Sequence, residues 1–178
     1  MAASRVRVAA ADLPTRRSAL AATYSLSPSL LKQCDDQTVA ALSALDSAGG
    51  RTVGNSAWGV VACPCLPGRQ RLTEVIAKFR ADGPWSVTPH YIPHAILHSM
   101  PGLLTQALGL HGPAAGVGGT PGAEDDALRT AAAWLAGGDL PGVWLVRTTP
   151  DGEALAGAVE PAAGPGEPDA WAAIAGAA

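Results

Sequence analysis

The stretch Trp58-Gly59-Val60-Val61-Ala62-Cys63 is a compact run of small, aromatic and β-branched residues, and Pro64, Pro67 and Gly68 follow it closely. A short apolar run between such turn residues is typical of a buried β-strand. A second run of the same kind, Val143-Trp144-Leu145-Val146, lies further along the chain. These two stretches indicate the centre of a sheet.

Helical patterns surround these two strands. Apolar residues recur at three- and four-residue steps over residues 32–48, 72–79, 93–104 and 124–135, which predicts four helices with an apolar face. Asp35 and Asp36 fall in the first turn of the first helix, where negative charge suits the helix dipole. Pro101 lies inside the third pattern and predicts a kink or a break there, because proline removes one backbone donor.

Three weaker strands complete the predicted sheet. Residues 5–10 alternate polar and apolar side chains, residues 114–117 form a short segment after Gly112-Pro113, and residues 154–159 follow a turn as an antiparallel partner. Residues 12–29 are mixed in character and are expected to form a connecting loop. Since strands and helices alternate, we expect one α/β domain over residues 1–160, followed by a Pro/Gly/Ala-rich tail over residues 161–178.

The composition limits the function. The chain has 178 residues, of which 48% are hydrophobic and 15% charged, and its formal net charge is −3. This balance excludes a disordered chain and gives no general electrostatic attraction to nucleic acid. We expect no membrane partner, because Gly, Pro or a charge interrupts every apolar stretch. Three cysteines argue against a disulfide framework, and the chain shows no secretory signal, so a cytoplasmic protein is expected.

Several motifs occur in an order that resembles the β-ketoacyl synthases. They are Asp35-Asp36-Gln37 at the start of the first helix, Gly59-Val60-Val61, Ser86-Val87-Thr88-Pro89, Met100-Pro101-Gly102-Leu103-Leu104 and Leu108-Gly109-Leu110-His111-Gly112-Pro113. The resemblance covers roughly residues 30–150 and is greatest to the short ketosynthase-like N-terminal domains and the chain-length factors. It implies half of a thiolase-type fold: one mixed, mostly parallel sheet of about five strands with helices on its faces.

The resemblance also identifies the position of the catalytic cysteine. In the family that thiol lies after the Gly-Pro strand, at the start of the next helix, where thioester chemistry needs a soft nucleophile. Counting from Gly112-Pro113 without a gap, the position falls on Pro121, which has neither a nucleophile nor an amide hydrogen for an oxyanion hole. Full synthases of the family are about twice as long and bring two histidines from their second half. No catalytic residue and no cofactor are therefore expected.

The helix predicted over residues 124–135 is apolar on much of its circumference, so we expect it to be covered on more than one side, by the C-terminal segment or by another polypeptide. Family members pair through the strand that corresponds to residues 114–117, and the helix that corresponds to residues 93–104 lies near their subunit interface. The resemblance thus implies an auxiliary subunit of a type II polyketide or fatty-acid system, which binds a catalytic ketosynthase or a ketosynthase/chain-length-factor pair and supports its assembly or its acyl pocket. The candidate interface residues are Ala114, Ala115, Val117, Leu128, Ile96 and Met100.

Two other functions stay open at this stage. The first is a free-standing module that binds an acyl chain or an acyl carrier protein. The second is a small thiol- or metal-dependent enzyme that uses Cys63, Cys65 and the histidines His90, His94 and His98. The Cys-Pro-Cys spacing and the lack of a second cysteine pair do not fit a zinc site, and polar residues on a helix surface explain the histidines. We expect no bound metal.

Overall fold

The computed structural model describes residues 3–28, 30, 34–50, 56–89, 96–119, 121–149 and 151–161. The predicted tail, apart from Pro161, lies outside these residues. A mixed sheet of five strands runs through the molecule in the order β1-β5-β4-β2-β3. The strands are β1 (Ala3–Arg7), β2 (Gly59–Cys63), β3 (Ala114–Gly116), β4 (Val143–Thr148) and β5 (Glu153–Val159). All five predicted strands are confirmed, with bounds that shift by a few residues.

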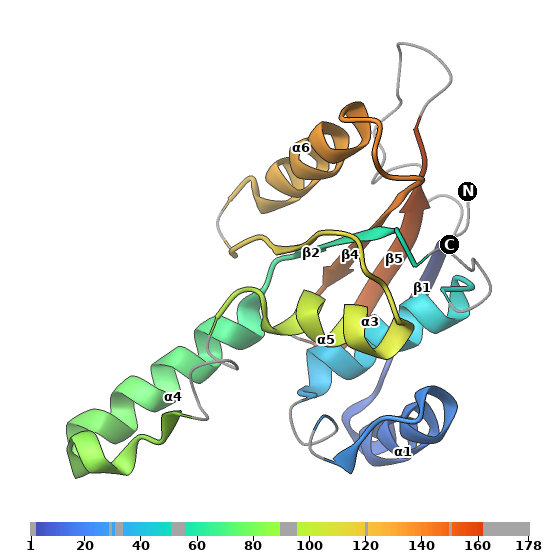
Figure 1. The fold of residues 1–178 in the computed structure, drawn as a ribbon. Helices are drawn as coiled ribbons and strands as arrows, with labels where there is room; N and C mark the ends of the chain where they lie inside the picture. Colours follow the sequence, from blue (N-terminus) through green and yellow to red (C-terminus); the bar gives the residue numbers. More distant parts are fainter. Residues whose placement is uncertain are drawn as a thin grey trace.

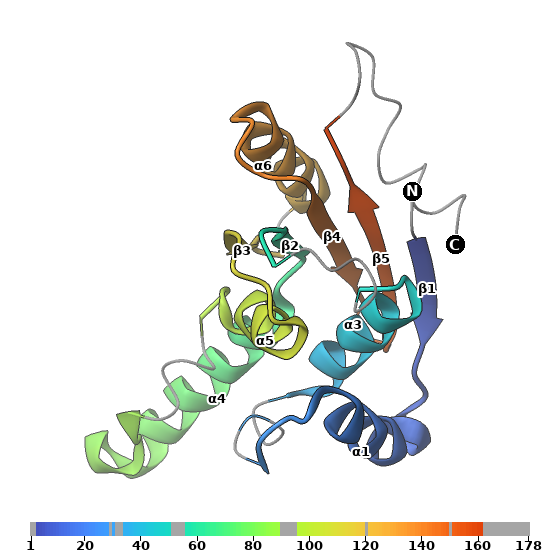
Figure 2. The ribbon, with the colours of Figure 1, turned by 45° about the vertical axis from the view of Figure 1, so that its right-hand side comes forward.

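The pairing of the strands gives the sheet its mostly parallel character. Strand β2 pairs in parallel with both β3 and β4, whereas β5 is antiparallel to β4 and to β1. Only β5 therefore points against the other four strands. Strand β1 forms one edge of the sheet, beside β5 (Figure 1), and β3 forms the other edge, beside β2 (Figure 2).

Helices cover the two faces of the sheet unequally. Helices α3 (Asp36–Ser47) and α5 (Ser99–Leu108) lie on one face, with α1 (Leu13–Tyr24) packed over α3, and α6 (Ala123–Ala136) lies on the other face (Figure 2). Side chains of β2 and β4 alternate between these faces: Val60 and Trp144 join the core under α3 and α5, and Val61 and Leu145 join the core under α6. The arrangement confirms an α/β fold with helices on both faces of one sheet.

Helix α3 is the most deeply buried helix among the described residues. Every side chain from Gln37 to Leu45 is buried, and Ala40, Ala41 and Ala44 are fully so. Small side chains allow this helix to lie between the sheet and α1, because the backbones can approach closely. The helix begins later than residue 32, since the Asp35 side chain accepts a hydrogen bond from the Thr38 N–H at 2.8 Å and caps its first turn.

The expected loop at residues 12–29 is wrong. Helix α1 occupies residues 13–24, and Pro14 lies in its first turn, where a missing N–H leaves no hydrogen bond unmade. Of its side chains only Leu20 is buried, so the helix carries almost no apolar periodicity for a sequence pattern to detect.

The expected start of the third helix, at Pro93, lies outside the described residues, but residues 96–98 are not helical and the expected kink at Pro101 is wrong. Helix α5 begins at Ser99, so Pro101 is its third residue and removes only a donor that the first turn leaves unpaired in any case. Helix α4 (Leu66–Asp82) begins six residues before the predicted pattern, with Pro67 in its first turn, and a short 3-10 helix, η2 (Pro84–Ser86), follows it.

Candidate functional site

An open hollow of about 560 Å³ lies where the chain enters α6. It is lined by Pro64, Gly119, Pro121, Gly122, Ala123, Glu124 and Asp125. The hollow thus brings the carboxyl end of β2 together with the first turn of α6. This is the place where the resemblance positions the nucleophile of a ketosynthase. Pro121 is exposed at this hollow, two residues before α6 begins.

The first turn of α6 brings negative charge to the hollow. Glu124, Asp125 and Asp126 follow one another there, where carboxylates suit the positive end of the helix dipole. A guanidinium nitrogen of Arg147, at the end of β4, lies 3.1 Å from a carboxylate oxygen of Glu124. Arg147 is not among the site residues that the sequence indicates. The sequence feature that could have pointed to it is its charge, directly after the apolar run Val143–Val146.

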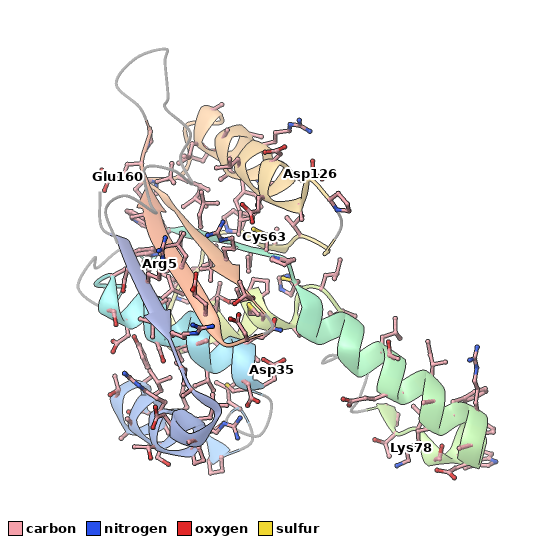
Figure 3. The ribbon with its side chains drawn as sticks, turned by 180° about the vertical axis from the view of Figure 1, so that it is seen from behind. Arg5, Asp35, Cys63, Lys78, Asp126 and Glu160 are labelled. Carbon is pink, nitrogen blue, oxygen red and sulfur yellow. The ribbon has the colours of Figure 1, made fainter. Side chains whose placement is uncertain are left out.

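Two thiols lie close to the hollow but inside the protein. Cys63 and Cys65 are each about 1% exposed. Burial, together with the nearby negative charge of Glu124, raises the pKa of Cys63 to about 12. Burial also raises the pKa of Cys65 to about 12, and its thiol donates to the Ala62 carbonyl at 3.3 Å. Figure 3 shows Cys63 between α6 and the middle of the sheet. Both thiols are therefore protonated at neutral pH and are poor nucleophiles.

The histidine and metal hypothesis finds little support in the described part of the chain. His90 and His94 lie outside it, and His98 is the residue before α5. Among the residues that the structure describes, no three His, Cys, Asp or Glu side chains lie close enough together to hold a metal ion.

The candidate interface residues fall into three places. Ala114 and Ala115 lie on the edge strand and Val117 follows it, and all three are partly exposed. Leu128 on α6 is also only partly buried, and like Val117 it packs against the core between α6 and the sheet. Ile96 is 46% exposed just before α5. Met100 is only 2% exposed and packs in the core beneath α5, so its side chain is not available on the surface.

The outer side of β3 is open within the residues that the structure describes, because no strand there pairs with it. Val60 donates to the Pro113 carbonyl at 2.9 Å, and Val117 donates to the Ala62 carbonyl at 2.9 Å. In a parallel ladder alternate residues point their backbone groups toward the partner, so those of Ala114 point away from β2. An edge of this kind is a template for another strand.

Helix α6 buries one face only in the described structure. Ala123, Ala127 and Ala131 are buried against the sheet, and Leu128 is half-buried. Its outer face carries the exposed side chains of Asp125, Asp126, Arg129, Ala132, Ala133 and Ala136. The sequence predicts that α6 is covered on more than one side. This stays a prediction, because a second covering layer would come from residues or partners outside the described part of the chain.

One mixed sheet of five strands with helices on both faces matches half of a thiolase-type fold. The chain is similar to a chain in the structure of the ketosynthase ApeO in complex with its chain length factor ApeC, from Xenorhabdus doucetiae. The match has a TM-score of 0.61 and 13% sequence identity, and it covers 92% of this chain and 79% of that chain. No protein-family profile matches the chain, and no curated protein is similar to it in sequence. None of the described helices is long and apolar enough to cross a bilayer.

Proposed function

We propose that this chain is a non-catalytic, ketosynthase-like auxiliary subunit that pairs with a catalytic ketosynthase of a type II polyketide or fatty-acid system. The observation that carries the proposal is the structural match to a chain from a complex between a ketosynthase and its chain length factor. Since this chain covers 79% of the matched chain, the two are similar in length.

The residues at the hollow support a role without chemistry. Pro121, at the position that the resemblance assigns to the nucleophile, lines the hollow and offers no side chain that attacks a thioester. Glu124 and Asp125 place carboxylates beside it, where they disfavour a thiolate. The nearest thiols, Cys63 and Cys65, are buried and protonated at neutral pH. The chain is therefore expected to contribute surface and shape to a complex, while the ketosynthase supplies the nucleophile.

The open edge of β3 supports pairing with another strand. The backbone groups of Ala114 face away from β2, and the side chains along the edge, Ala114 and Ala115, are small enough for a second backbone to approach. Small side chains on a partly exposed edge do little to block such pairing, whereas charged residues and bulges are the usual protection.

The test is purification of the tagged chain from its native host, followed by mass spectrometry of the proteins that accompany it. We expect a catalytic ketosynthase in near-equal amount. The Ala114→Pro variant removes only an outward N–H, which an edge strand tolerates, and should lose the ketosynthase. The control is Arg5→Ala on β1, the opposite edge of the sheet, which should keep it.

A wild-type chain that is recovered alone contradicts the proposal. If that lone monomer is stabilised against heat by acyl chains or by an acyl carrier protein, the chain is instead a free-standing binding module. Recovery of the ketosynthase in equal amounts with wild type and Ala114→Pro removes β3 from the interface.

A further inference from the structure

Helix α1 lies at the outside of the fold. Among the described elements it packs chiefly against α3 and against the short 3-10 helix η1 (Ala10–Asp12) that precedes it. Figures 1 and 2 both show α1 beyond α3, on the side away from the sheet. Helix α3, in contrast, is buried along most of its length. Helix α1 therefore covers α3 rather than packing directly on the sheet.

The contact face of α1 is a single narrow stripe. Its side chains follow each other at steps of four, three and four residues: Leu13, Arg17, Leu20 and Tyr24. Only Leu20 is fully buried, and all other side chains of α1, apart from the half-buried Ala21, are exposed. Most helices in proteins depend on burial of an apolar face for their stability. A stripe with one buried leucine therefore stabilises α1 only weakly.

Two sets of polar contacts join α1 to the two ends of α3. A guanidinium nitrogen of Arg17 donates to the Cys34 carbonyl at 3.0 Å and lies 3.4 Å from a carboxylate oxygen of Asp36, the first residue of α3. The Tyr24 hydroxyl donates to a carboxylate oxygen of Asp46, near the end of α3, at 2.7 Å. The ion pair is exposed to solvent and contributes little. The hydrogen bond of Tyr24 is part-buried and is thus the stronger contact.

Two features of α1 oppose its closed position. The Nε atom of Arg17 is buried and has no hydrogen-bond partner in the described structure. A buried donor without an acceptor is unfavourable, because it has lost its contact with water. Ser25, the C-terminal cap of α1, has a φ angle of 51°, in the left-handed region that favours glycine. Both unfavourable terms disappear when α1 leaves α3 and unfolds.

We propose that α1 is a cover, residues 13–24, that opens by itself: it leaves α3 and unfolds locally while α3, the sheet and α6 stay folded. Segments with few buried apolar contacts are the ones that open at low free energy. The open state exposes Leu20 and the side of α3 that α1 covers, both of which belong to the core between the sheet, α3 and α5. The chain thus has a second state in which part of this core is accessible. The inference does not rest on the proposed function, because α1 contacts neither β3 nor the first turn of α6 to any extent.

The test is hydrogen exchange of the full chain, followed by mass spectrometry, at urea concentrations below the unfolding transition. We expect the amides of α1 to exchange at least about a hundredfold faster than those of α3. The rate in α1 should depend little on urea, because a local opening exposes little surface.

Two variants should change exchange in α1 in opposite directions. Tyr24→Phe keeps the ring but removes the hydrogen bond to Asp46, so exchange in α1 should become about tenfold faster. Ser25→Gly relieves the left-handed backbone, so exchange in α1 should become about two- to fivefold slower. Arg16→Gln, on the exposed side of the helix, is the control and should exchange like wild type. Exchange in α3 should stay the same in all three variants.

Three results would overturn the cover. The first is exchange of α1 at the same rate as α3 and with the same dependence on urea, which would mean that both open together. The second is a Tyr24→Phe variant in which α3 and the sheet lose as much protection as α1. The third is a Tyr24→Phe variant that exchanges like Arg16→Gln. None of these results depends on a ketosynthase, so the cover and the proposed function fail separately.

Discussion

Gly116 lies where the segment that enters α5 passes closest to β3. A Cβ atom at this position would lie 1.9 Å from the carbonyl oxygen of Leu97 and 2.9 Å from the sulfur of Cys65. The missing side chain therefore allows the chain before α5 to rest on the edge strand. Gly118, two residues later, is different, because its Cβ would meet only a methyl group of Leu97 at 3.7 Å.

The pair of glycines gives a stability prediction. Gly116→Ala should destabilise the protein by about 1–3 kcal/mol, because the Leu97 backbone must move to accept the new methyl group. Gly118→Ala should leave stability unchanged or raise it by up to about 1 kcal/mol, since alanine restricts the unfolded chain. Urea unfolding of both variants checks this. Equal stability of the two would mean that the close approach at Gly116 is not a constraint.

The buried thiols give a prediction about reactivity. At about pH 8, the rise of the pKa of Cys63 and Cys65 from 9.0 to about 12 lowers the thiolate fraction about a thousandfold. Iodoacetamide should therefore alkylate both residues far more slowly in the native protein than in urea, as measured by peptide mass spectrometry. A Pro121→Cys variant is the positive control, because that position is exposed and its new thiol should react faster than the two buried thiols. Rapid native alkylation of Cys63 or Cys65 would contradict the structure.

At the scale of elements, the sequence predicted the strands well and the helix boundaries less well. The runs at residues 58–63 and 143–146 are buried on both faces, so they are apolar throughout and easy to detect. Helix α1 escaped detection because it lies at the outside of the helical layer, and only Leu20 is buried. Pro101 predicted a kink or a break, and the stretch that contains Pro14 a loop, although each proline lies in a first turn, where proline is tolerated.

The sequence predicted some features of the candidate site and missed others. The position of Pro121 at the entrance to α6 followed from the spacing of the motifs, because a helix start and a preceding Gly-Pro fix it closely. The ion pair between Arg147 and Glu124 could not be predicted, since it joins residues 23 positions apart through the packing of α6 on β4. The exposure of Leu72, Ile76 and Phe79 on α4 could not be predicted either, because an apolar helix face has the same pattern whether or not its own chain covers it.

The cap of α3 gives a prediction at the element scale. Asp35→Ala should reduce stability by about 1 kcal/mol, because the Thr38 N–H then loses its acceptor at the first turn of a buried helix. Asp36→Ala is the matched control: its carboxylate is exposed and lies 3.4 Å from a guanidinium nitrogen of Arg17, a surface pair that contributes about 0–1 kcal/mol. Thermal unfolding followed by circular dichroism separates them. A larger loss for Asp36→Ala would argue against the cap.

At the scale of the whole molecule, the chain has the architecture of half a thiolase-type fold, with a sheet edge that no described strand covers. Helix α6 is covered on one face in the described residues, and the outer side of β3 is unpaired there. These features lie on surfaces that a second protein could cover. The proposed function assigns these surfaces to contact with a ketosynthase.

The most direct measurement is the mass of the mixture of this chain and its ketosynthase, by size-exclusion chromatography with light scattering. We expect one peak that contains both proteins in equal numbers. Any dimer that the chain forms alone at the same concentration should be replaced by the mixed complex when the ketosynthase is added. Separate elution of a stable monomer and the ketosynthase, at concentrations well above micromolar, would contradict the claim that this chain is a partner subunit.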